Sequence, residues 1–142
     1  NLFAIDSFNG IFMYSRSNRS HNTNKPAISW LKISDIPNEL PQEQEEGDWT
    51  ASIINDNIYI SMIEPWHNNG CSSPLSDDNI ANIAMFNLIT NQWKYDLDSW
   101  NKSEEVVEFE GPLSMLHISD KLHIFDTAKG SHSIYNENSQ LF

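Results

Sequence analysis

The side chains in this chain that are capable of chemistry do not combine into a metal-binding pattern. His67 and Cys71 are four residues apart in one polar segment, and the oxygen-rich run Asp77-Asp78-Asn79 follows in the same segment. His117 and His123 lie on either side of one predicted turn. None of these groups completes the ligand spacing of a zinc site or of an EF-hand loop. The sequence therefore predicts no metal and no cofactor.

Residues that could catalyse a reaction do not form a known catalytic motif either. The chain has no G-x-S-x-G nucleophile motif, no phosphate-binding loop and no G-x-G-x-x-G dinucleotide motif. Cys71 has no identifiable base beside it in the sequence. Carboxylates are numerous, but their number alone does not indicate the paired acid and base of a glycosidase. We expect a protein that is not an enzyme.

Acidic residues gather in three segments, 35–48, 64–78 and 96–110, which hold fifteen of the 20 acidic residues and one base. The net charge of −12 disfavours nucleic acid and favours a protein partner with a basic surface. Aromatic side chains among these charges are typical of a protein-binding hot spot. The alternative is that the charged segments only solvate the rim of the fold. The candidate binding residues are Glu64, Trp66, His67, Asp77, Asp78, Trp100, Glu104 and Glu105.

Composition and length indicate one all-β domain. The chain has 142 residues, of which 39% are hydrophobic, and its many aromatic, Ser, Asn and Gly residues favour short strands over long helices. It has no apolar run long enough to span a membrane. The single cysteine favours a reducing compartment, and we expect a cytoplasmic protein. Two sequons, at Asn18 and Asn101, indicate the opposite, a glycosylated secreted protein.

The same short pattern occurs twice in the second half of the chain. Phe86-Asn87 is followed after five residues by Trp93, and Tyr135-Asn136 is followed after five residues by Phe142. The two pairs are 49 residues apart, and a period of this length is typical of repeat architectures. The segments before them also align, 54–60 with 118–124, and 7–13 takes the same place earlier. We expect these aromatic residues to pack in a core.

Each repeat is predicted to contain four antiparallel strands, the first two joined by a two-residue turn at Asn9-Gly10, Asp56-Asn57 or Asp120-Lys121. In the first repeat, Trp30 occupies the place that Trp93 has in the second, so 28–33 is predicted as the fourth strand. The predicted strands are 2–8, 10–15, about 21–24 and 28–33; 49–55, 57–62, 82–88 and 92–97; and 112–119, 121–125 and 131–136.

Four-stranded units at this period, with an aromatic residue in the third strand and a tryptophan in the fourth, resemble Kelch repeats. The residues that carry the resemblance are Phe86 to Trp93 and Tyr135 to Phe142. The paired glycines that the family carries after the second strand are missing here, and residues such as Met62 and Ser15 stand in their place. The resemblance implies a β-propeller whose blades are about 1–35, 49–98 and 112–142, the last one incomplete.

Three blades cannot close a propeller ring, which has four to eight. We therefore expect one segment of a larger propeller, covalently continuous with further blades. The resemblance implies a protein–protein interaction module, such as a scaffold or a substrate-recruiting adaptor. Two alternatives remain open from the sequence. One is a secreted propeller that resembles galactose oxidase or binds carbohydrate, and the other is a purely structural part of a large assembly.

Overall fold

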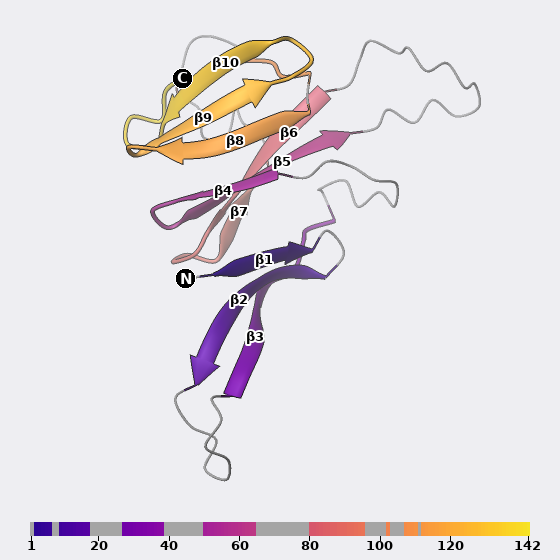
Figure 1. The fold of residues 1–142 in the computed structure, drawn as a ribbon, viewed down its shortest axis with the longest axis vertical. Coiled ribbons are helices and arrows are strands. Elements are labelled where there is room, and N and C mark those ends of the chain that lie inside the picture. The colour runs from indigo at the N-terminus through magenta and orange to yellow at the C-terminus, as the bar shows by residue number, and fades with distance from the viewer. Residues whose placement is uncertain are drawn as a thin grey trace, which may run out of the picture. The chain divides into compact units, whose positions relative to one another are not determined.

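The structure, a computed structural model, describes residues 2–6, 9–17, 27–38, 50–64, 80–95, 102, 107–110 and 112–142. These residues form ten β-strands and no helix, so the predicted all-β class is confirmed (Figure 1). The strands make three small antiparallel sheets, and no strand pairing joins one sheet to another within the described ranges. The chain divides into two compact units, 1–42 and 43–142.

The first unit contains the first sheet, in which β1 (Phe3–Asp6), β2 (Gly10–Ser17) and β3 (Ala27–Ser34) lie in that order. The strand that the sequence predicts as the fourth of its repeat is β3, and it pairs directly with β2. Trp30 therefore lies opposite Tyr14, with ring centroids 5.5 Å apart, and does not take the place of Trp93. The strand predicted near 21–24 lies outside the described residues.

The second sheet matches the predicted unit strand for strand. Its strands β4 (Thr50–Ile54), β5 (Asn57–Glu64), β6 (Ile80–Asn87) and β7 (Gln92–Lys94) neighbour one another in chain order. β-Branched and aromatic residues are frequent in β4 and β5, which favours strands, and the run Ile58-Tyr59-Ile60 is fully buried. This up-and-down order places the β4–β5 and β6–β7 turns at one end of the sheet and the segment 65–79 at the other.

The third sheet has three strands, β8 (Leu113–Ile118), β9 (Lys121–Asp126) and β10 (Ser131–Asn136), also in chain order. After β10 the chain turns back, and Leu141 forms an isolated bridge with Asn136. This bridge stands where the second sheet has β7.

The hairpin turns differ from their predicted positions by one residue. Ile54 pairs with Asn57 and Ile118 pairs with Lys121, so the turns are Asn55-Asp56 and Ser119-Asp120. The positive φ angles fall on Asn55, Ser119 and Asp120, at 49°, 48° and 60°. Ile54 is fully buried at the end of β4, so the β4–β5 turn falls on the polar residues that follow it. The β8–β9 turn takes the same position after Ile118.

The first hairpin is not the predicted two-residue Asn9-Gly10 turn. Asp6 pairs with Gly10, and the backbone N–H of Asn9 donates to Asp6 Oδ1 at 2.9 Å. Gly10 is the first residue of β2, with φ at 113°, and a Cβ there would lie 2.0 Å from the carbonyl oxygen of Ser34. Only glycine tolerates both this φ and this close approach of β3.

The second and third sheets share one pairing register. Ile58 pairs with Phe86, and the aligned residue Leu122 pairs with Tyr135. Pairs on the other face of each sheet correspond in the same way, because Tyr59 pairs with Met85 and His123 pairs with Ile134. The two sheets therefore repeat residue by residue.

The repeated aromatic pattern also repeats in geometry. The Phe86 and Trp93 rings have centroids 5.0 Å apart at 45°, and the Tyr135 and Phe142 rings have centroids 5.0 Å apart at 47°. In each turn between the paired rings, the side-chain oxygen of an asparagine, Asn87 or Asn136, accepts hydrogen bonds from the backbone N–H groups two and three residues later. The residue four positions after the asparagine has a positive φ angle in both turns. The asparagine thus fixes the turn that returns the second ring to the first.

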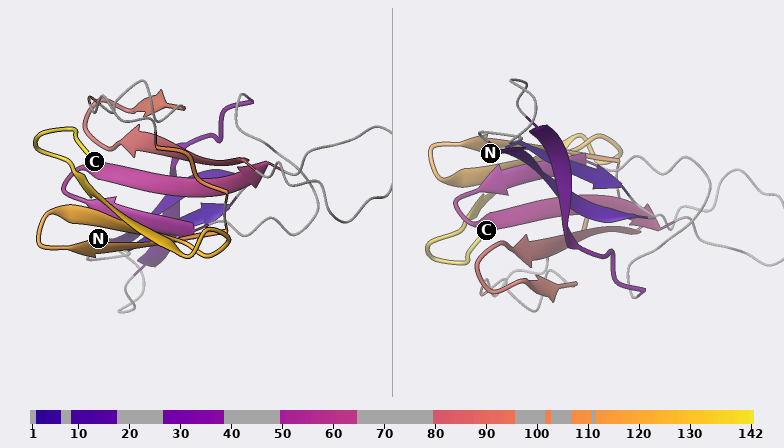
Figure 2. Two further views of the ribbon diagram at one scale, coloured as in Figure 1. Left: turned by 90° about the horizontal axis from the view of Figure 1, so that it is seen from above. Right: turned by 90° about the horizontal axis from the view of Figure 1, so that it is seen from below.

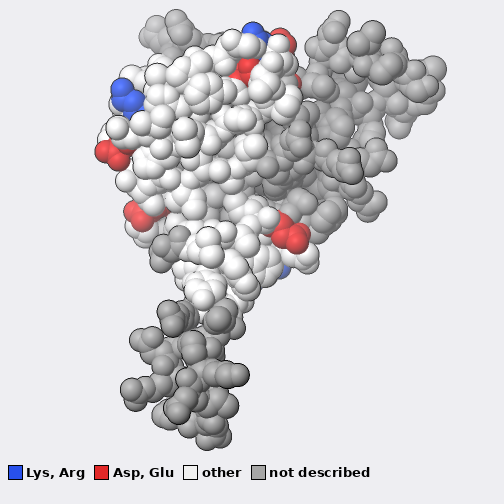
Figure 3. Space-filling model, in the orientation of Figure 1, with Lys and Arg blue, Asp and Glu red and all other residues white. Residues whose placement is uncertain are grey.

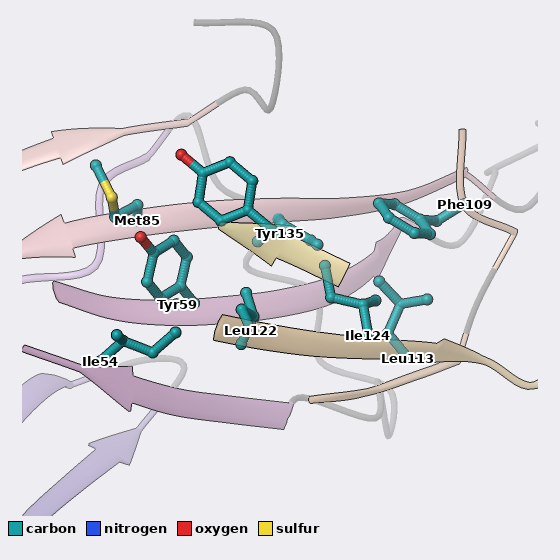
Figure 4. Packing of buried hydrophobic residues seen from close by; sticks show 9 residues of the cluster. Ile54, Tyr59, Met85, Phe109, Leu113, Leu122, Ile124 and Tyr135 are labelled. Atoms are coloured by element: carbon teal, nitrogen blue, oxygen red, sulfur yellow. The ribbon is translucent and has the colours of Figure 1, made fainter. Parts of the chain in front are cut away.

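The core of the second unit lies between its two sheets. Figure 4 shows Tyr59 and Met85 of the second sheet facing Tyr135 of the third, with Leu122 close to Tyr59. Figure 2 shows that the strands of the two sheets run alongside one another when viewed from above. The buried cluster consists of Ile54, Tyr59, Ile83, Met85, Phe109, Leu113, Leu122, Ile124 and Tyr135.

Candidate functional site

A pocket of about 290 Å³ opens at the turn end of the two packed sheets. Asn57 and Tyr59 line it from β5, Met85 and Lys94 from the neighbouring strands, and Glu137 from the turn after β10. Residues of the β6–β7 turn and of the turn after β10 surround the pocket, next to core side chains such as Tyr59 and Met85. It is therefore bounded by polar turn residues and floored by core side chains.

The carboxylate of Glu137 is the centre of a hydrogen-bond network in this pocket. The side-chain amides of Asn55 and Asn57 and the hydroxyl of Tyr59, at 2.9 Å, all donate to it. Asn87 extends the network by donating from Nδ2 to Asn57 Oδ1 at 2.7 Å. Donors from the second sheet thus satisfy an acceptor on the third, which ties the two sheets together at this end.

Two buried tyrosines next to this carboxylate have perturbed acidities. Burial raises the pKa of the Tyr59 hydroxyl far above its usual value, and the charge and hydrogen bond of Glu137 raise it further. The hydrogen bond with Asn57 acts in the opposite direction. Burial, followed by the charge of Glu137, also raises the pKa of Tyr135. Both hydroxyls are therefore fixed in the protonated form in the folded protein.

We expect these tyrosines to make the second unit lose stability in alkaline solution. Below about pH 10, the usual tyrosine pKa, both states keep the protons and the tyrosines add no pH dependence. Above it, only the unfolded chain releases them, so the free energy of unfolding falls by up to about 1.4 kcal/mol per pH unit for each tyrosine. Urea titrations at increasing pH, followed by phenolate absorbance, would measure this.

The matched controls for this pH dependence are Tyr59→Phe and Tyr135→Phe. Each variant should flatten the alkaline slope by one tyrosine's share, because phenylalanine has no proton to release. An alkaline slope that is the same in the wild type and in both variants would refute the assignment.

The hydrogen bonds already made in the pocket give Glu137 a structural role. Three donors from the second sheet already occupy the carboxylate of Glu137. A carboxylate held in this way serves as a structural acceptor, since taking up a proton would break the network. Lys94 is the one cation among the residues that line the pocket.

A second feature is a stack of rings on the exposed face of the third sheet. His123 Nδ1 and His132 Nε2 are 3.0 Å apart, and the two imidazoles lie nearly parallel at 5.1 Å. Phe125 stacks on His132 at 4.4 Å with an angle of 6°. These rings come from adjacent strands because His132 pairs with Phe125 in the register of β9 and β10.

Of the candidate binding residues predicted from the sequence, the structure places one. Glu64 is the last residue of β5, where it pairs with Ile80 at the end of the sheet opposite the pocket. Trp66, His67, Asp77, Asp78, Trp100, Glu104 and Glu105 lie outside the described residues, as do the sequon asparagines Asn18 and Asn101. The described residues of the pocket and of the ring stack include none of the predicted binding residues.

Sequence reasoning missed Glu137, although a signal was present. The repeat alignment sets Glu137 opposite Leu88, so a charged residue replaces an apolar one directly after the aligned asparagines. A charge at such a position indicates a specific partner, here three donors about 80 residues away in the chain.

The described part of the chain contains neither a cluster of metal ligands nor a membrane-spanning helix. No group of three or more His, Cys, Asp or Glu side chains there is placed to hold a metal ion. None of the described segments forms a helix with the length and apolar character needed to cross a membrane.

Comparison of the chain with family models, with curated proteins and with solved structures found no match.

Proposed function

We propose that this chain is a non-enzymatic protein–protein interaction module, built from Kelch-like repeats as a segment of a larger propeller. The single observation that carries the proposal is the arrangement of the second sheet. Four strands in up-and-down order, with the turns at one end, leave the long connections at the other. Rigid sheets that present loops in this way are typical scaffolds for binding.

The acidic segments supply the binding chemistry in this proposal. Three acidic segments flank the strands of the second sheet in the chain: 38–49 precedes β4, 65–79 joins β5 to β6, and 95–112 follows β7. Most of the acidic residues and the loop tryptophans gather in these segments. In the last segment, the backbone N–H of Lys102 donates to the carbonyl oxygen of Gln140 at 2.7 Å, which places that residue beside the turn after β10. A partner with a basic surface would be attracted to the acidic segments by charge, and the aromatic side chains would supply apolar contact.

The proposal is tested by charge reversal inside and outside the acidic segments. Proteins captured from lysate are identified and purified, and their affinity for the wild type, Glu104→Lys and Glu105→Lys is measured at increasing salt. We expect each reversal to weaken binding several-fold at low salt, mainly by slowing association, and the difference to shrink as salt increases.

Asp56→Lys is the matched control, because it makes the same charge change in the β4–β5 turn, which belongs to none of the acidic segments. It should leave affinity within about twofold of the wild type. Binding that is insensitive to salt and to both acidic-segment reversals would contradict an acidic binding surface.

A further inference from the structure

The outer face of the third sheet is an exposed apolar surface. We define it by the apolar and imidazole side chains that point away from the second sheet, which are Leu116, Ile118, His123, Phe125, His132 and Ile134. Ser114 and Lys121 lie on the same side of the sheet by register, with Lys121 at the β8–β9 turn. Leu116 is 53% exposed, Ile118 45%, Ile134 40% and Phe125 39%. Large apolar side chains this exposed on neighbouring strands are typical of a surface that another structure covers.

The second sheet shows what covers a face of this kind. The counterparts of Ile118 and Ile134 in the repeat are Ile54 and Met85, which occupy the same register positions in the second sheet. Ile54 is fully buried and Met85 is 8% exposed, because the third sheet packs over them. The same face of the repeat is therefore covered in one sheet and open in the next.

The covering surface is also defined by the structure. The third sheet covers the second with its inner face, which includes Leu122, Ile124 and Tyr135. In the second sheet the corresponding positions are Ile58, Ile60 and Phe86, which lie on the side that points away from the third sheet. These side chains are also large, apolar and buried. The inner face is thus large and apolar in both sheets, and the third sheet uses it to cover the outer face of the second.

The charge of the outer face sets it apart from the rest of the chain. None of its six residues is acidic, whereas the chain as a whole has a net charge of −12. Figure 3 shows charged side chains at the margins of the described surface in that view and none over its centre. Burying such a face requires little desolvation of charge.

We infer that the outer face of the third sheet binds the apolar inner face of a further sheet of this same repeat, supplied by the natural polypeptide. The third sheet packs on the second in this arrangement. This inference rests on the proposed function, which takes the chain as part of a longer repeat. A polar group of the incoming sheet would lie opposite His123 and His132, since each ring has a second nitrogen without a partner among the described residues.

Thiol labelling of the outer face tests the inference. Leu116→Cys and Ile134→Cys are prepared separately on a Cys71→Ser background, both in the 142-residue chain and in the full natural polypeptide. Maleimide should label both cysteines rapidly in the 142-residue chain. In the natural polypeptide we expect labelling at least about tenfold slower, which corresponds to an opening free energy of about 1.4 kcal/mol.

Ile89→Cys is the matched control, since Ile89 is 70% exposed in the β6–β7 turn and should react rapidly in both proteins. Equally fast labelling at the outer face of the natural polypeptide would overturn the inference. Protection that appears in the 142-residue chain and increases with its concentration would also overturn it, in favour of a second copy. Neither outcome depends on Glu104 or Glu105, so failure of the acidic binding surface is distinguished from failure of this one.

Discussion

Replacing Tyr135 with alanine is expected to lower the free energy of unfolding of the second unit by about 3–5 kcal/mol, as removal of a buried aromatic side chain does. Tyr135 is 1% exposed and stands between the two sheets, with ring contacts to Tyr59 at 6.1 Å and to Phe142 at 5.0 Å. Alanine leaves a cavity and removes both contacts. Because small domains are stable by only about 5–15 kcal/mol, this loss would be a large share of the total.

Ile134→Ala is the control for this prediction. Ile134 precedes Tyr135 on β10 but lies on the outer face and is 40% exposed, so its loss should cost only about 0.5 kcal/mol. Urea unfolding, with hydrogen exchange of the Leu122 and Ile124 amides to report on this unit alone, measures both variants. Similar losses for the two substitutions would mean that the core does not lie between these sheets.

The strands of the second and third repeats could be predicted because local signals agree with the packing there. Along β9, Leu122 and Ile124 alternate with less buried residues, which leaves one register that buries this apolar pair. Along β5 the run Ile58-Tyr59-Ile60 is apolar throughout, and the polar turn before it marks where the strand begins. The two turns were predicted one residue too far along the chain. The sequence shows which residues tolerate a positive φ angle, whereas strand pairing decides which of them adopts it.

The first repeat shows the limit of the aromatic spacing. Trp30 stands at a suitable distance from the first hairpin to be read as a fourth-strand residue, but spacing does not encode which strand β3 will pair with. In the structure its neighbour is β2, and the rings of Tyr14 and Trp30 make the cross-strand pair. An aromatic pair forms in either topology, so the residue types alone could not distinguish them.

The candidate sites also differ in whether the sequence carries a local signal for them. Charge and composition indicate the acidic segments directly, because their residues are adjacent in the chain. The Glu137 network has no such local signature, since its donors Asn57 and Tyr59 are 80 and 78 residues from it. Only the register between the two sheets brings them together.

Removing the carboxylate of Glu137 is expected to destabilise the second unit by about 1–3 kcal/mol, the usual cost of leaving a buried donor unsatisfied. In Glu137→Ala the hydroxyl of Tyr59, which is fully buried, loses the acceptor it has at 2.9 Å. The amide of Asn55 is more exposed and can turn to water, so it should contribute less.

A double-mutant cycle isolates the interaction between the two sheets. Tyr59→Phe removes the donor, Glu137→Gln keeps the shape of the acceptor without its charge, and the double variant removes both. Because the hydroxyl and the carboxylate interact directly, the second substitution should cost less once the first is in place. Urea unfolding of the four proteins gives the coupling energy, and additive losses would show that the negative charge of Glu137 adds nothing to this hydrogen bond, which the amide oxygen of glutamine can still accept. Asp56→Ala is the control for charge, since it removes a carboxylate from the adjacent turn that has no side-chain hydrogen bond to the described residues. It should leave stability unchanged within about 0.5 kcal/mol, as surface substitutions usually do.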